Sequence, residues 1–116
     1  MQQPQPDLRV ELSIRTRSEG GTRRTPVGSG IRYRTKIRED MGNDARFDFL
    51  DTDSLAPGER CIALATFVFP ELLDGRIAAG RVYGIGDDPA DEARFTVLEI
   101  LTPSLTAFDE HEDHHE

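Results

Sequence analysis

The sequence predicts an all-β protein, built as a single six-stranded antiparallel barrel of Greek-key type with a disordered acidic C-terminal tail. Three observations support this prediction. Apolar and polar residues alternate in several segments, as they do in half-buried strands. Turns that contain glycine or proline separate those segments. No segment shows the apolar spacing of an amphipathic helix, so a small barrel is favoured over a mixed fold.

Length and composition set the domain organisation. The chain has 116 residues, which is enough to bury one core. We expect a flexible N-terminus over residues 1–6, the barrel over residues 7–102 and the tail over residues 103–116. The last eight residues contain five acids and three histidines. Repulsion between like charges should keep this tail extended.

The first two predicted strands show the alternation most clearly. The strand over residues 7–17 has an apolar face formed by Leu8, Val10, Leu12 and Ile14. The strand over residues 31–38 alternates Ile31, Tyr33, Thr35 and Ile37 with the cations Arg32, Arg34, Lys36 and Arg38. Several glycines and a proline lie between the two segments and predict an irregular loop.

Four further strands are expected over residues 46–51, 61–69, 76–85 and 93–101. The segment 61–69 is almost continuously apolar, which is typical of a strand covered on both faces. Gly80 and Gly84 interrupt the alternation of apolar and polar residues in segment 76–85, as glycines do at barrel corners or bulges. Residues 72–73 allow at most one helical turn. The predicted core consists of Val10, Leu12, Ile14, Ile31, Tyr33, Ile37, Phe47, Phe49, Ile62, Leu64, Val82, Phe95, Val97 and Ile100.

Charge is distributed unevenly along the chain. Residues 1–46 carry ten Lys and Arg against six Asp and Glu, whereas the remainder carries four against sixteen, for a net charge of −8. If the first two strands lie near each other, six outward cations share one face. With the adjoining glycine loop, the predicted macromolecule-binding residues are Arg15, Arg17, Gly20, Gly21, Arg32, Arg34, Lys36 and Arg38.

A basic face of this kind suits a nucleic-acid backbone, because phosphate neutralisation releases counterions. This face, however, lacks aromatic residues that could stack on bases, and the whole chain is acidic. We therefore expect a protein partner and keep RNA as the alternative.

The residues do not predict an enzyme. Every histidine lies in the tail (His111, His114 and His115), so no Ser-His or Cys-His pair is expected in the barrel. The only cysteine, Cys61, lies in an apolar run, which predicts an inert core thiol and excludes an intramolecular disulfide. The tail histidines could bind a divalent cation, but ordering the tail would cost entropy. We expect no catalytic residue, no metal and no cofactor.

Several motifs resemble, in the same order, the C-terminal β-barrel domain of translation elongation factor Tu. The match covers approximately residues 8–101 and rests on Glu19-Gly20-Gly21-Thr22-Arg23-Arg24-Thr25-Pro26, on Gly30-Ile31-Arg32, on Leu55-Ala56-Pro57-Gly58-Glu59 and on Phe69-Pro70. The family shows Glu-Gly-Gly-Arg-x-Thr-Pro, a Gly-Tyr-Arg strand start, Met-Pro-Gly-Asp and His-Pro. The resemblance implies a β-barrel that helps to hold the acceptor and T-stem end of aminoacyl-tRNA and contacts protein partners.

The sequence also departs from the family. It has an extra residue within the Gly-Gly loop, Tyr33-Arg34 in place of Pro-Gln, Phe69 in place of His, and an extended last hairpin at residues 87–91. The P-loop pattern Gly-x-x-x-x-Gly-Lys-Ser/Thr is absent, so no nucleotide is expected. These departures leave the partner of the barrel open.

The leading hypothesis is a stand-alone binding module that contacts a macromolecule through its outer surface. One alternative is a small acidic protein that neutralises another protein, as toxin-neutralising immunity proteins do, through its acidic turn and tail. A further alternative is a structural or homo-oligomeric role through sheet edges. The sequence has no apolar run of membrane-spanning length and no signal-peptide pattern, which predicts a cytoplasmic protein without membrane contact.

Overall fold

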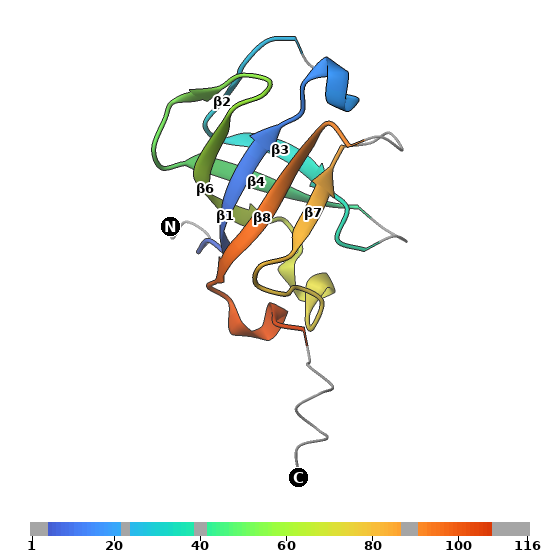
Figure 1. Cartoon of the computed structure of the whole chain (residues 1–116). Coiled ribbons are helices and arrows are strands. Elements are labelled where there is room, and N and C mark those ends of the chain that lie inside the picture. The colour runs from blue at the N-terminus through green and yellow to red at the C-terminus, as the bar shows by residue number, and fades with distance from the viewer. Residues whose placement is uncertain (1–4, 22–23, 39–41, 87–90, 108–116) are drawn as a thin grey trace.

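The computed structural model describes residues 5–21, 24–38, 42–86 and 91–107. Six strands close into the predicted antiparallel barrel (Figure 1). They are β1 (Leu8–Ile14), β3 (Ile31–Thr35), β4 (Asn43–Phe49), β6 (Arg60–Phe67), β7 (Val82–Ile85) and β8 (Ala93–Ile100). A small second sheet pairs β2 (Val27–Gly28) with β5 (Ser54–Leu55). Three short 3-10 turns are η1 (Arg17–Glu19), η2 (Pro70–Leu73) and η3 (Pro103–Leu105).

The strand order around the barrel is β1-β6-β4-β3-β7-β8, and β8 closes back onto β1. The strands β3, β4 and β6 are consecutive antiparallel neighbours, and β7 then returns to pair with β3. Three consecutive strands with a fourth beside the first define a Greek key, so this part of the prediction is confirmed. One consequence is that β1 has β6 and β8, not β3, as its neighbours.

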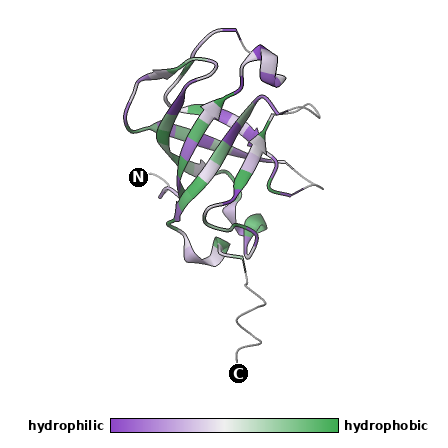
Figure 2. Ribbon diagram, in the orientation of Figure 1, coloured by the Kyte–Doolittle hydropathy of each residue, from purple (hydrophilic) through white to green (hydrophobic). Residues whose placement is uncertain are grey.

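The core forms because alternate side chains of each strand point into the barrel. Figure 2 shows this alternation of polar and apolar residues along the strands. Aromatic rings cross the interior in contact: Tyr33 with Phe47 at a centroid distance of 6.3 Å, Phe47 with Phe95 at 5.7 Å, and Phe95 with Tyr83 at 5.6 Å. Tilted and edge-on ring pairs of this kind are the favoured arrangements.

The predicted core is wrong for β6. We expected Ile62 and Leu64 inside, but these side chains are only half-buried, and the buried residues of β6 are Cys61, Ala63, Ala65 and Phe67. The register gives the reason. Ala65 lies directly opposite Phe47 of β4, Ala63 opposite Val10 of β1, and Cys61 opposite Leu12 of β1. Large inward side chains on the neighbouring strands leave room only for small ones at these three positions, whereas the inward Phe67 of β6 lies opposite the small Ala45.

The predicted core is also wrong for β7, which is shorter than expected. Val82 is 54% exposed, whereas Tyr83 points inward and is buried. Because Gly84 has no side chain, the sequence of this strand does not reveal whether Val82 or Tyr83 points inward. The polar end of Tyr83 is satisfied, because its hydroxyl accepts the Ala78 N–H at 3.1 Å and donates to the Arg76 carbonyl at 3.3 Å.

The folded part continues past the expected boundary at residue 102. Leu105 of η3 is fully buried together with Leu73 and Ile77. The Ile77 N–H donates to the Leu105 carbonyl, and the Ala107 N–H donates to the Ile77 carbonyl. Residues 103–107 therefore close one end of the barrel. The rest of the predicted tail, residues 108–116, lies outside the described residues, as do residues 1–4 of the predicted flexible N-terminus.

The contact between β3 and β7 is the shortest strand pairing of the barrel. Its register holds one residue pair, Thr35 opposite Ile85. Two further backbone hydrogen bonds flank it, from Lys36 to the Gly84 carbonyl at 3.0 Å and from Gly86 to the Arg34 carbonyl at 2.9 Å. We call this contact the β3–β7 seam.

Candidate macromolecule-binding surface

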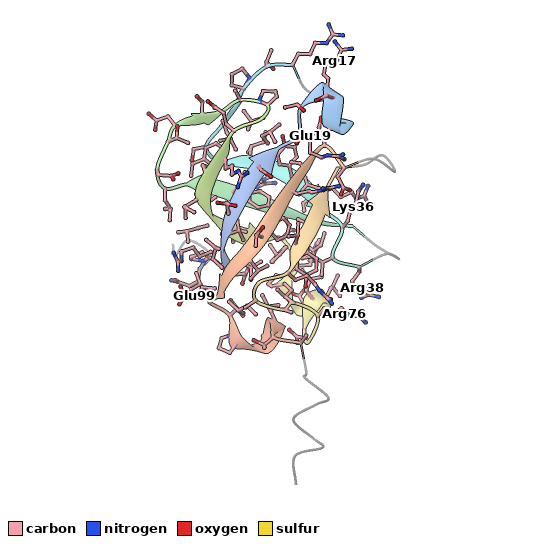
Figure 3. The ribbon with its side chains drawn as sticks, in the orientation of Figure 1. Arg17, Glu19, Lys36, Arg38, Arg76 and Glu99 are labelled. Atoms are coloured by element: carbon pink, nitrogen blue, oxygen red, sulfur yellow. The ribbon has the colours of Figure 1, made fainter. Side chains whose placement is uncertain are left out.

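The barrel topology divides the predicted basic face into separate parts. Since β1 pairs with β6 and β8 while β3 pairs with β4 and β7, the two strands are not neighbours in the barrel. In Figure 3, Arg17 lies at the end of the molecule that carries η1, well away from Arg38. The condition under which six cations would share one face, that the first two predicted strands lie side by side, is therefore not met.

Two of the predicted cations are engaged around one carboxylate. The Lys36 ammonium lies 2.9 Å from Oδ1 of Asp91, and Arg15 Nη1 donates to the Asp91 backbone carbonyl at 2.9 Å. Arg94 Nε adds a longer contact of 3.4 Å to Oδ2. An ideal Cβ on Gly84 would overlap the Asp91 carboxylate, so the glycine makes this approach feasible. Arg15 and Lys36 thus hold the β7–β8 connection.

The environment of Asp91 changes its pKa. Partial burial acts to raise the pKa, but the hydrogen bonds and charges of Lys36 and Arg94 together outweigh it. The pKa of Asp91 is therefore lowered from its ordinary value, and the carboxylate is charged at neutral pH.

The predicted glycine loop has a structural explanation. Gly20 ends η1 with φ of +103°, a conformation that favours glycine. Gly21 is buried, and a Cβ there would overlap the Arg15 carbonyl. The Thr16 N–H donates to Glu19 Oε1 at 2.8 Å, and hydrogen bonding to Thr16 is the main cause of the lowered pKa of Glu19. Loop geometry thus accounts for both glycines, and the neighbouring Arg17 is exposed to solvent.

The remaining predicted cations lie along β3 and just after it. Arg38 approaches η2, where its Nη1 lies 3.4 Å from the Leu72 carbonyl. Arg34 is exposed and lies directly opposite Asp44 of β4. Arg32 is exposed and lies directly opposite another cation, Arg46. Among the residues that the structure describes, none forms a hydrogen bond or ion pair with Arg32.

Arg32 and Arg46 border an open groove of about 640 Å³ on the outer face of β3, β4 and β6. The groove is lined by Gln5, Asp7, Arg32, Arg46, Asp48, Thr66, Phe67, Val68 and Pro70. We call it the β4 groove. Arg46 is paired with Asp48 at 2.9 Å. The groove thus combines a cationic end with an apolar end.

Two exposed side chains lie at or next to the apolar end of the β4 groove: Val68 lines it, and Phe69 follows Val68 in the chain. Val68 is 47% exposed, and the next residue, Phe69, is 54% exposed. Buried Asn43 holds the backbone at this point: its Nδ2 donates to the Phe69 carbonyl at 2.8 Å, and its Oδ1 accepts the Phe69 N–H at 3.3 Å. The Val68 N–H donates to the Asp44 carbonyl at 2.9 Å. The exposed side chains therefore project from a fixed corner of the fold.

A second groove, of about 450 Å³, lies on another side of the barrel, over the outer faces of β1 and β8. Its charged lining residues are Glu11, Arg15, Glu19, Arg60 and Arg94. Arg94 lies 3.4 Å from the Asp91 carboxylate and Arg60 lies 3.8 Å from Glu11, so most of these charges have opposite charges close by. The lining is mainly polar and includes little of the exposed apolar surface.

The sequence analysis missed Arg46, Thr66 and Val68 as surface residues of a common site. One signal was present, since Arg46 alternates with the inward Phe47 and so must point outward. The register that places Arg46 opposite Arg32, however, cannot be read from either strand alone. The apolar corner was read simply as the end of a strand.

The described residues offer few groups for chemistry. Cys61 is 3% exposed, and burial, helped by the charge of Asp51, raises its pKa to about 11. The neutral thiol that results is a poor nucleophile. Within residues 5–21, 24–38, 42–86 and 91–107, His, Cys, Asp and Glu form no group of three or more that could hold a metal ion. The acidic turn at residues 87–90 and the tail histidines lie outside these ranges.

No protein-family model matches the chain. Among curated proteins, none matches either. The resemblance to the elongation factor barrel therefore stays a prediction, although the closed antiparallel barrel that it implied is present. No helix in the described part of the chain is long and apolar enough to span a membrane.

Proposed function

We propose that this chain is a non-enzymatic binding module, in the manner of a translation-factor barrel, that contacts another protein through the outer face of β3, β4 and β6. The observation that carries the proposal is the position of Arg32. It is exposed, lies opposite Arg46 and borders a groove that is also lined by exposed Val68, which exposed Phe69 follows in the chain. Arginine beside aromatic and aliphatic side chains is the composition that protein interfaces favour.

Protein is favoured over RNA because acids interrupt the cations on this face. Asp44 lies opposite Arg34, and Asp48 pairs with Arg46 at 2.9 Å. A phosphate backbone gains affinity from several cations that are free to neutralise it. Alternating charges give a smaller gain with phosphates but suit the mixed charges of a protein surface.

The test places a photo-crosslinking amino acid at Thr66 or, as a matched control, at Thr96. Both threonines lie on outward faces and are half-buried, but Thr66 lines the β4 groove and Thr96 lines the groove over β1 and β8. In the cells that produce the protein, we expect the photo-crosslinking amino acid to capture a protein from position 66 and to capture none from position 96. Arg32→Glu should reduce the Thr66 crosslink, and ribonuclease should leave it unchanged.

Two results would overturn the proposal. Crosslinks from Thr96 alone would place the partner on the other groove. Crosslinks from Thr66 to RNA, with binding that weakens steeply as salt is added, would assign the face to nucleic acid instead.

A further inference from the structure

The electrostatics of the β4 groove point to a single negative charge as its ligand. Arg32 and Arg46 occupy directly opposite positions on neighbouring strands, where like charges repel. Asp48 offsets Arg46, but no described residue offsets Arg32. A carboxylate placed between the two guanidinium groups would accept charge-assisted hydrogen bonds from both.

The acids around the groove disfavour a more highly charged ligand. Asp48 lies beside Arg46, and Asp7 also lines the groove. Both oxygens of Asp7 are engaged, one by the Phe67 N–H at 2.9 Å and the other by the Thr102 hydroxyl at 2.7 Å. Their negative charges reduce the attraction for a dianionic phosphate more than for a carboxylate.

The apolar end adds a second requirement. Val68 and Phe69 remain exposed although buried Asn43 fixes the backbone that carries them. A side chain on a fixed backbone loses little conformational freedom when a partner covers it, which favours binding. The ligand should therefore carry an apolar side chain next to its carboxylate.

We propose that the β4 groove binds a protein segment in which Asp or Glu stands beside a large apolar residue. The carboxylate lies between Arg32 and Arg46, and the apolar side chain packs on Val68 and Phe69. This inference rests on the proposed function and specifies its partner. The segment belongs to another protein, and the chain's own acidic residues 108–116 are a competing occupant that the experiment separates.

The experiment measures fluorescence anisotropy of the full chain with a labelled peptide, acetyl-Leu-Glu-Leu-Glu-Leu-amide. We expect saturable binding that weakens about tenfold with Arg32→Gln, since each charged hydrogen bond contributes on that scale. Phe69→Ser should weaken it to a similar degree. The matched control Arg60→Gln removes the same charge from an arginine outside the groove, with a side chain 71% exposed, and should leave binding unchanged.

Two further peptides and a charge reversal test the chemistry. Replacing both Glu of the peptide by Gln, or its Leu residues by Ser, should abolish measurable binding. Arg32→Glu should reject the Glu peptide and gain affinity for acetyl-Leu-Lys-Leu-Lys-Leu-amide. Such a gain cannot arise from loss of folding.

The outcomes against the inference are distinct. Equal losses with Arg32→Gln and Arg60→Gln would show non-specific charge attraction, and tighter binding of a ten-nucleotide uridine RNA would show a phosphate site. Binding only after the acids of residues 108–116 are neutralised would assign the groove to the chain's own tail. If the Thr66 crosslinker captures a protein but the Glu peptide never binds, this inference fails while the proposed function stands.

Discussion

Replacing Asp7 by alanine should destabilise the barrel strongly. Asp7 is only 5% exposed and joins the start of β1 to β6 and to the segment that follows β8. Its Oδ2 accepts the Phe67 N–H at 2.9 Å, and its Oδ1 accepts the Thr102 hydroxyl at 2.7 Å. Alanine removes both acceptors and leaves the backbone that carries Asp7 unchanged.

The magnitude follows from the burial of the two donors. The Phe67 N–H would be left buried without an acceptor, which costs about 2 kcal/mol, and the Thr102 hydroxyl, which is partly exposed, loses about 1 kcal/mol. The total of about 3 kcal/mol corresponds to a decrease in Tm of about 12 °C for a chain of this length. Asp7→Asn keeps one acceptor and can donate to the Thr102 hydroxyl, so we expect it to lower the free energy of unfolding by only about 1 kcal/mol.

Urea denaturation and calorimetry of the wild type, Asp7→Ala, Asp7→Asn and Thr102→Val measure these values. The expected order of stability is wild type, then Thr102→Val and Asp7→Asn together, then Asp7→Ala. The reasoning is refuted if the free energy of unfolding of Asp7→Ala lies within about 0.5 kcal/mol of the wild-type value, which is the scale of an ordinary surface substitution. It is also refuted if Asn and Ala are equally destabilising.

Three shorter predictions test other parts of the structure. Because the pKa of Asp91 is lowered from its ordinary value of 3.8, its ion pairs stabilise the fold at pH values above 3.8, and this contribution is lost as pH falls through the pKa of the folded state. Asp91→Asn should lower the free energy of unfolding by about 1 kcal/mol at pH 7. In urea titrations, the stability of this variant should also fall less steeply with acid than that of the wild type. Gly21→Ala should destabilise the chain by about 2 kcal/mol, since its Cβ overlaps the Arg15 carbonyl, and a wild-type Tm would contradict this. Cys61, with a pKa of about 11, should react with a thiol reagent at pH 8 far more slowly in the native protein than in urea, and equal rates would disprove its burial.

The alternation of apolar and polar residues predicted which side chains point inward in strands that have one apolar and one polar face. Leu8, Val10, Leu12 and Ile14 are all buried in β1, as expected, and so is Phe47 in β4. In β6 both faces are apolar, so hydropathy could not decide which one points inward. The size of the opposing side chains decides instead, and the residues opposite become known only from the register.

The candidate site could be predicted only in part, for a similar reason. Arg32 was recognised as an outward cation from its own strand. Its pairing with Arg46 depends on which strands become neighbours, and the engagement of Lys36 by Asp91 depends on where the start of β8 lies relative to the end of β3. Such contacts between distant segments leave no periodic signal in the sequence.

At the β3–β7 seam, fewer hydrogen bonds hold neighbouring strands together than elsewhere in the barrel. A cylinder of strands that must open locally does so where the fewest backbone hydrogen bonds break, and here that place is the single Thr35–Ile85 pair with its two flanking bonds. Amide protons at the seam should therefore exchange with solvent before those of β1, which is paired along nearly its whole length on both sides. Opening at this seam breaks no hydrogen bond between β4 and β6, so the part of the groove on these two strands keeps its shape, while β3, which carries Arg32, borders the line that opens.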